Sequence, residues 1–270
     1  MKRLLILFLF LTLLAACRQN KRNRHTLPGG DLLFEEFYSN GQLKSSKHFF
    51  NEAMTDYLYL AYYENGELMD SVAYDENVPE GKRVFFHQSS GIRHVEHYEN
   101  GVLNGVNTGI YENGVRNYEG YRKAGEKVGE WFFRSPEGVN LTYEFYDSTG
   151  QLVYFRKYDE GGRYQKSNGE VLINAGFTNN QIDSGDSIFT GIVAAVPPGC
   201  ESKLNVYLVH EQMEDTVIIS RILASPRHEF GLPVSQPGMY KMAIQLTVTD
   251  LLTGKTEESK VEKKLTVRDN

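Results

Sequence analysis

Between about residues 35 and 165, apolar and polar positions follow one recurring pattern. Aromatic residues lead into a short polar turn with glycine, and a segment of alternating apolar and polar residues follows, as in the stretch that begins Tyr62-Tyr63-Glu64-Asn65-Gly66. The turn recurs at 37–41, 62–66, 85–91, 110–114, 132–138 and 145–150. The first five turn glycines lie about 24 residues apart, which is a period typical of a repeat array.

The spacing of apolar residues after each turn predicts extended strands. An apolar residue and an aromatic residue six positions later recur as Leu43 and Phe49, Leu68 and Tyr74, Ile92 and Tyr98, Val115 and Tyr121, Val139 and Phe145, and Leu152 and Tyr158. Six residues of α-helix would leave two side chains about 120° apart, whereas a regular strand places both on one face. Asn-Gly turns supply the positive φ that tight hairpins require. We therefore predict a meander of antiparallel strands, two per repeat, with both members of each pair on the same face.

After Gly169 the pattern stops, and Val, Ile, Leu and Thr segments alternate with proline-bearing turns. Strands are predicted at 170–177, 187–194, 203–210, 216–223, 228–233, 238–249 and 258–267. This number of short strands over about a hundred residues is typical of a β-sandwich, here of an immunoglobulin-like kind without a Cys-Trp-Cys signature. The glycines between Gly161 and Gly169 indicate a boundary there, so we expect a fragment from Gly169 to fold alone.

Two phrases resemble MORN-type repeats, in the bacterial form grouped with YwqK-like proteins. One begins at Tyr62, and the other runs from Gly125 to Phe133 and contains the only complete Gly-x-x-x-Gly-x-Trp phrase, which ends at Trp131. The resemblance covers about half of the chain and implies an elongated sheet of hairpins that serves as a scaffold or interaction platform. The rings form the core of such a sheet or a surface for a partner, and the sequence leaves both readings open.

The N-terminus has the parts of a secretory signal. Lys2 and Arg3 precede an apolar run from Leu4 to Leu14 that is interrupted only by Thr12, and small residues follow. The tetrapeptide Leu14-Ala15-Ala16-Cys17 resembles the bacterial lipobox, which implies that Cys17 is acylated and becomes the new N-terminus. By resemblance to the sorting rules of bacterial lipoproteins, Arg18 after this cysteine gives no inner-membrane retention signal. The basic stretch that follows lacks the acidic cluster associated with export to the cell surface, so we expect an outer-membrane protein that faces the periplasm.

The expected order is therefore a signal peptide (1–16), a basic flexible tether (17–34), MORN-like hairpins (35–166) and an immunoglobulin-like sandwich (167–270), all-β throughout. Lys21, Arg22 and Arg24 give the tether a charge that suits anionic headgroups, although a solvated linker is an equal reading. The formal charge of −6 gives no sign of nucleic-acid binding. With Cys17 acylated, Cys200 has no disulfide partner, and we interpret it as a structural thiol.

No catalytic motif was found in the sequence. His94 and His97 are three apart on a predicted strand and therefore face opposite ways, which argues against a metal site. We predict no catalytic residue, no metal and no cofactor. The leading hypothesis is a non-enzymatic envelope protein that binds a protein or glycan partner. The alternative is an accessory envelope hydrolase or transferase whose site lies at the junction of the two domains.

Two further sets of residues are candidates for function. Arg116 and Tyr118 were predicted on the sheet face opposite the Val115 and Tyr121 pair, where a partner would dock. Four Asp-Ser or Asp-Thr steps followed by an apolar or small residue resemble the O-glycosylation motif of Bacteroidetes-type export pathways, which implies modification at Ser71, Ser148, Ser187 and Thr216.

The lipobox generates the first testable prediction. Cys17→Ser should yield an unprocessed or soluble protein, because no acyl chain can be attached to serine at this site. Fractionation and intact-mass measurement of the mature chain check it. Recovery of the variant in the membrane fraction with the wild-type processed mass would rule out the lipid anchor.

Overall fold

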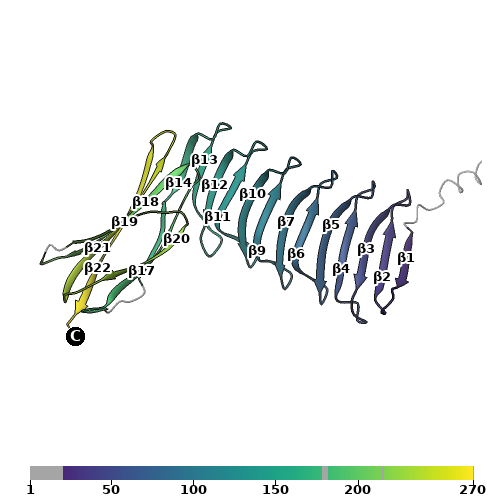
Figure 1. Cartoon of the computed structure of the whole chain (residues 1–270), viewed down its shortest axis with the longest axis horizontal. Coiled ribbons are helices and arrows are strands. Elements are labelled where there is room, and N and C mark those ends of the chain that lie inside the picture. Colours follow the sequence, from purple (N-terminus) through teal and green to yellow (C-terminus); the bar gives the residue numbers. More distant parts are fainter. Residues whose placement is uncertain (1–20, 178–181, 214–215, 270) are drawn as a thin grey trace, which may run out of the picture. The chain divides into compact units, whose positions relative to one another are not determined.

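The computed structural model describes residues 21–177, 182–213 and 216–269, and all regular secondary structure in them is β-strand (Figure 1). The prediction of an all-β chain with a long antiparallel sheet followed by a sandwich is confirmed. Within these residues there is no helix with the length and hydropathy needed to span a bilayer. The lipobox and Cys17 lie outside the described residues.

Fourteen strands form one sheet in chain order, with β8 beside β7 and off the main path. They are β1 (Arg22–Thr26), β2 (Leu32–Phe37), β3 (Leu43–Phe49), β4 (Tyr57–Tyr62), β5 (Leu68–Asp75), β6 (Val78–Phe86), β7 (Ile92–Glu99), β8 (Val102–Leu103), β9 (Gly105–Ile110), β10 (Arg116–Lys123), β11 (Glu126–Arg134), β12 (Asn140–Tyr146), β13 (Leu152–Tyr158) and β14 (Tyr164–Gly169). The chain also divides into two compact units, residues 1–105 with 109–114 and residues 106–108 with 115–270.

In the first unit, a tyrosine or histidine side chain before the turn links one repeat to the next. The Tyr38 hydroxyl donates to the carbonyl oxygen of Tyr62 at 2.7 Å, and the Tyr63 hydroxyl donates to that of Phe86 at 2.8 Å. His87 occupies the same place in the following repeat, with its Nε2 atom 2.8 Å from a strand carbonyl. The period seen in the sequence is therefore also a period of side-chain contacts between strand ends.

Four of the six predicted same-face pairs are wrong, because a β-bulge follows the turn. Ser45 lies opposite Glu36 while Leu43 lies opposite Phe37, so one extra residue of β3 is inserted between them. The same shift occurs after Leu68, Ile92 and Leu152. A bulge places two residues against one and breaks the alternation of faces. The residue after the turn and the aromatic residue six positions later therefore lie on opposite faces of these strands.

The expected tether also ends earlier than residue 34. β1 is paired with β2 from Arg22 onward, and the ladder includes Arg24 opposite Phe34. Strand pairing therefore begins within the segment that the sequence assigned to a flexible linker. The basic residues that suggested a linker are compatible with an edge strand, where charged side chains are common.

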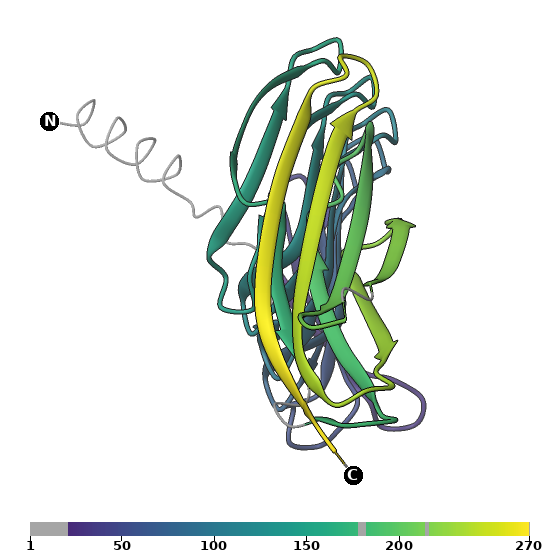
Figure 2. The same cartoon turned by 90° about the vertical axis from the view of Figure 1, so that its left-hand side faces the viewer.

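The second unit combines β10 to β14 with the sandwich. Its strands are β15 (Leu172–Phe177), β16 (Ile182–Asp183), β17 (Ser187–Ala194), β18 (Cys200–His210), β19 (Thr216–Ile222), β20 (Arg227–Pro233), β21 (Gly238–Asp250) and β22 (Thr256–Arg268). One sheet has the order β15-β17-β20, and the other has the order β16-β22-β21-β18-β19. Figure 2 shows β21 and β22, in yellow-green and yellow, as long antiparallel neighbours.

The expected boundary near residue 167 does not separate two cores. Tyr143 and Tyr154 of the long sheet belong to the same buried cluster as Leu204 and Ile244 of the sandwich, and Phe145 and Tyr158 are also members of this cluster. A fragment that starts at Gly169 lacks these rings and with them part of the buried cluster, and its independent folding stays a prediction. The split into compact units falls near residues 105 to 115 instead.

The only tryptophan of the chain depends on a glycine in the neighbouring strand. Trp131 is 2% exposed and lies directly opposite Gly120 of β10. A Cβ atom added at Gly120 would lie 2.1 Å from Cδ2 of Trp131, so the ring fills the space that a side chain would need. Trp131 also donates through Nε1 to the carbonyl oxygen of Tyr121 at 3.2 Å.

Gly120→Ala should therefore destabilise the second unit by about 1–3 kcal/mol through overpacking. Urea unfolding followed by the fluorescence of the single tryptophan measures the change. Gly191→Ala is the matched control, because a Cβ atom there would meet nothing within 4 Å. Equal midpoints for the two variants would contradict the close packing of Trp131 on Gly120.

Candidate functional site

A groove of about 870 Å³ lies over the first five strands, within the first unit. Its aromatic lining comes from four of these strands and consists of Phe34, Phe49, Tyr57, Tyr59 and Tyr74. Polar side chains contribute the rest together with Met54, namely Arg22, Asn23, Glu35, Glu36, Ser45 and Lys47. An open site with an aromatic floor and a few charged groups has the composition of many ligand and partner sites.

Strand register explains why these rings lie together. Phe49, Tyr57 and Tyr74 are direct cross-strand partners and therefore share one face. Their rings follow one another at centroid distances of 4.9 Å and 4.6 Å, and Phe34 meets Phe49 edge-on at 5.4 Å. Such contacts between neighbouring strands stabilise this part of the sheet, where the described residues of the first unit supply no second layer.

Charged side chains flank the rings. Lys47 is exposed, and its ammonium group lies 4.7 Å from the centroid of the Tyr57 ring. Arg22 of β1 forms an ion pair with Glu36 of β2, with Nε and Oε1 2.6 Å apart, at one end of the groove. Burial raises the pKa of Tyr59, and the negative charge of Asp70 adds to this effect, so the hydroxyl is a neutral donor at physiological pH. The groove thus offers an apolar floor, a cation and hydroxyl groups.

The loop between β3 and β4 forms one wall of the groove. Met54, which lies in this loop at a φ of 57°, is 39% exposed. The Asn51 side chain accepts from the amide of Thr55 at 3.0 Å, and the Asp56 carboxylate accepts from the amide of Glu76 at 3.1 Å. That backbone hydrogen bond is the main reason why the pKa of Asp56 lies below its usual value. These hydrogen bonds therefore fix the conformation of the loop without a bound partner.

The sequence-predicted binding residues lie in the second unit and are not part of this groove. Arg116 is exposed and forms an ion pair with Glu119 at 2.6 Å. Tyr118 belongs to an aromatic cluster, since its ring stacks near Trp131 with centroids 6.2 Å apart. Tyr121, which was expected to point toward the hydrophobic side, is 45% exposed. Docking at Arg116 and Tyr118 stays a prediction, but the ring of Tyr118 is not on a purely polar face.

The proposed glycosylation positions differ in exposure. Ser148 is exposed in the turn between β12 and β13, and Thr216 is exposed at the start of β19. Ser71 and Ser187 are half-buried within strands. Modification is therefore sterically simplest at Ser148 and Thr216, and it stays a prediction at all four positions.

His94, one of the two histidines considered as metal ligands, packs against an aromatic ring. The His94 ring stacks on Phe85 with centroids 3.9 Å apart, and burial lowers its pKa. Its Nε2 atom lies 3.8 Å from a carboxylate oxygen of Glu96. In residues 21–177, 182–213 and 216–269, no group of three or more His, Cys, Asp or Glu side chains is arranged to hold a metal ion.

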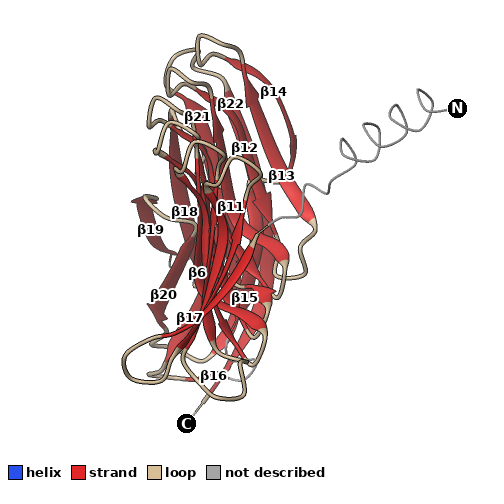
Figure 3. Ribbon diagram, turned by 90° about the vertical axis from the view of Figure 1, so that its right-hand side faces the viewer, coloured by secondary structure: helices blue, strands red, loops and turns tan. Residues whose placement is uncertain are grey.

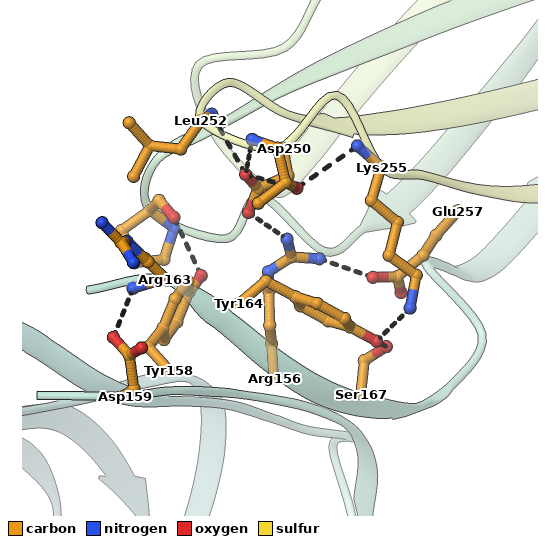
Figure 4. Close-up of polar contacts among 12 residues, drawn as sticks. Arg156, Tyr158, Asp159, Arg163, Tyr164, Ser167, Asp250, Leu252, Lys255 and Glu257 are labelled. Carbon is orange, nitrogen blue, oxygen red and sulfur yellow. Dashed lines mark hydrogen bonds and ion pairs between the residues drawn. The ribbon is translucent and has the colours of Figure 1, made fainter. Parts of the chain in front are cut away.

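A buried ion network lies where β13 meets the β21–β22 hairpin, inside the second unit (Figure 4). Arg156 has no exposed side-chain surface, and its guanidinium donates to Asp250 and to Glu257, each at 2.5 Å. Tyr154 donates to the second oxygen of Glu257 at 2.9 Å. The Asp250 carboxylate also caps the hairpin turn by accepting from the amide of Thr253 at 2.8 Å. The network therefore joins strand β13 to the sandwich.

Tyr154 of this network and the neighbouring Cys200 have shifted pKa values, but the network lacks the features of a catalytic site. Burial raises the pKa of Cys200 to about 11, so the thiol is protonated at neutral pH and is a weak nucleophile. Burial and the charge of Glu257 raise the pKa of Tyr154. The carboxylates are already engaged by Arg156, which is itself shielded from solvent. The geometry is that of a structural ion pair.

No protein-family model and no curated protein matches the chain. The site must therefore be interpreted from its own geometry. On that basis the groove is the stronger candidate for function, because it is open and lined by groups with free surface. The Arg156 network is closed and its main polar groups are paired.

The Arg156 network predicts a dependence of stability on pH. Burial alone would raise the pKa of Asp250, but hydrogen bonds from Thr253 and Arg156 outweigh it, and the pKa lies below the usual 3.8. A carboxylate with a depressed pKa stabilises the fold above its unfolded pKa, and this contribution is lost as pH falls through the folded pKa. Asp250→Asn should cost about 1–3 kcal/mol at neutral pH.

The difference in unfolding free energy between wild type and Asp250→Asn should therefore shrink as pH falls below 3.8. Urea unfolding at a series of pH values measures it. Glu160→Gln, an exposed position of the same unit, is the control and should follow the wild-type curve. A difference that stays constant from neutral to acid pH would show that the ion pair does not stabilise the fold.

Proposed function

We propose that the protein is a non-enzymatic, lipid-anchored envelope protein that binds a partner through its repeat sheet. The observation that supports this most directly is the open groove over β1 to β5, with its row of rings beside Lys47. Aromatic residues and methionine are enriched in protein interfaces, and charged groups at the margin supply specificity. The MORN-type phrases, which resemble those of scaffold proteins, support the same function.

The position of the groove relative to the proposed anchor favours a partner near the membrane. Arg22 lines the groove and is only five residues after Cys17 in the sequence. Five residues span at most about 18 Å when fully extended. If Cys17 carries the acyl chains, the groove is held close to the lipid headgroups. An outer-membrane location facing the periplasm fits this proposal, and a protein or glycan component of the envelope is the expected partner.

The enzymatic alternative has less support from the geometry. It placed a site at the junction of the repeat strands and the sandwich, which is where Arg156, Asp250 and Glu257 lie. These groups bind one another and are shielded from solvent, so they are poorly placed to contact a substrate. Turnover of an envelope substrate by the purified protein would support the enzymatic alternative.

The groove generates a direct test of binding. Lys47→Glu and Met54→Glu change exposed side chains of the groove, so both should lower partner capture at least about tenfold while leaving the fold intact. Photo-crosslinking from position 54 in the native host, followed by mass spectrometry, identifies the partner. Circular dichroism and urea unfolding confirm that the variants are folded.

Lys157→Glu is the matched control, because it makes the same charge change at an exposed position of β13. Both groove variants could still capture the partner while Arg116→Ala and Tyr118→Ala do not. This result would show that the binding surface lies in the second unit. Capture lost equally in the control would indicate a general charge effect and would argue against the groove.

A further inference from the structure

Among the terminal strands of the sandwich, β19 has an open outer edge along its whole length. β19 pairs with β18 through all seven of its residues without a shift in register. It is the last strand in its five-stranded sheet, and none of the described strands pairs with its other side. Figure 3 shows β19 at the outer margin of the sandwich. An open strand edge presents a row of backbone donors and acceptors that another strand can use.

The direction of these backbone groups follows from one hydrogen bond. The amide of Leu223, directly after β19, donates to the carbonyl oxygen of Ser202 in β18 at 2.8 Å. Backbone groups of successive residues point to opposite sides of a strand, so those of Ile219 and Arg221 also point toward β18. The N–H and C=O groups of Ile218, Ser220 and Ile222 therefore point outward, to the open edge.

The side chains of this edge do not protect it from pairing. Ile218 and Ile222 are 59% and 57% exposed, and β19 contains neither a proline nor a bulge. Its only charged residue, Arg221, lies over the Phe230 ring at 4.9 Å, on the inner face. By contrast, β1 at the end of the long sheet carries two arginines and a histidine among five residues, which is a common way to block edge pairing.

We propose that β19 is a self-association edge, where a second copy of this chain adds its own β19 in antiparallel orientation with Ser220 opposite Ser220. In this register Ile218 of each copy lies opposite Ile222 of the other, on the same outer face. All three outward-pointing residues form hydrogen-bonded pairs, which gives about six backbone hydrogen bonds. The contact is a symmetric one, with the same residues used by both copies.

Charge and side-chain matching favour a second copy as the occupant. Self-pairing brings no like charges together, because Arg221 lies opposite Ile219 in this register. A shift by two residues on the other copy would place Ile218 opposite Ser220 and leave the two exposed isoleucines without a direct apolar partner. The proposal is independent of the groove and of the lipid anchor, since it depends only on β19 and its neighbours.

The test uses the full chain with Cys200→Ser as background and Ser220→Cys added. Hydrogen-bonded antiparallel partners have Cα atoms about 5.5 Å apart, which suits a disulfide. Mild oxidation should therefore give a disulfide-linked dimer. Thr247→Cys, on the outer face of the same sheet but away from β19, is the matched control and should give none. The background without an added cysteine excludes dimers formed through Cys17.

Ile218→Lys should weaken association at least about tenfold in sedimentation equilibrium, because a lysine at this edge must be desolvated on pairing. Leu252→Lys adds the same charge at a position 73% exposed in the β21–β22 turn and should leave association unchanged. A monomer at every concentration, a dimer insensitive to Ile218→Lys, or a host protein crosslinked at position 220 in place of a second copy would each overturn the proposal.

Discussion

Contact between side chains of neighbouring strands is the interaction on which the first unit depends. Its sheet has no second layer among the described residues, so each strand must bury apolar surface against the strands beside it. Phe49, Tyr57 and Tyr74 do so in a continuous row, and the tyrosines before the turns add a hydrogen bond from each repeat to the next. Rings that hold the strands together also form the floor of the groove. Stability and proposed binding therefore use the same residues, and the exposed Lys47 and Met54 are the positions where the two can be separated.

The second unit is stabilised differently, because here the sheet does meet another layer. Tyr143 and Tyr154 turn toward the sandwich and join its core, which removes the need for a separate domain boundary. Arg156 enters the same region with two carboxylates as partners. A buried ion pair adds little net stability compared with an apolar contact, but removing one partner is costly. The network therefore acts mainly to fix how β13 sits against the β21–β22 hairpin.

Two of the terminal strands of the described sheets, β1 and β19, have opposite chemistry at their open edges. β1 is short and basic, and it lies next to the proposed lipid anchor, where positive charge suits anionic headgroups. β19 is apolar and carries its one charge on the inner face. An edge of the first kind resists pairing with another strand, whereas an edge of the second kind favours it. The proposals thus assign self-association to β19, whereas β1 belongs to the proposed partner groove.

The sequence by itself determined where the strands lie, since alternation and turn residues are local properties. Residues 187–194 were predicted and found as β17, and the glycine turns of the repeats were placed correctly. The faces of the repeat strands were not determined, because the extra residue of a bulge is set by pairing with the neighbouring strand. The groove combines side chains from several strands, and Arg156 binds partners 94 and 101 residues away. Such contacts arise only from tertiary packing, and no local pattern of the sequence encodes them.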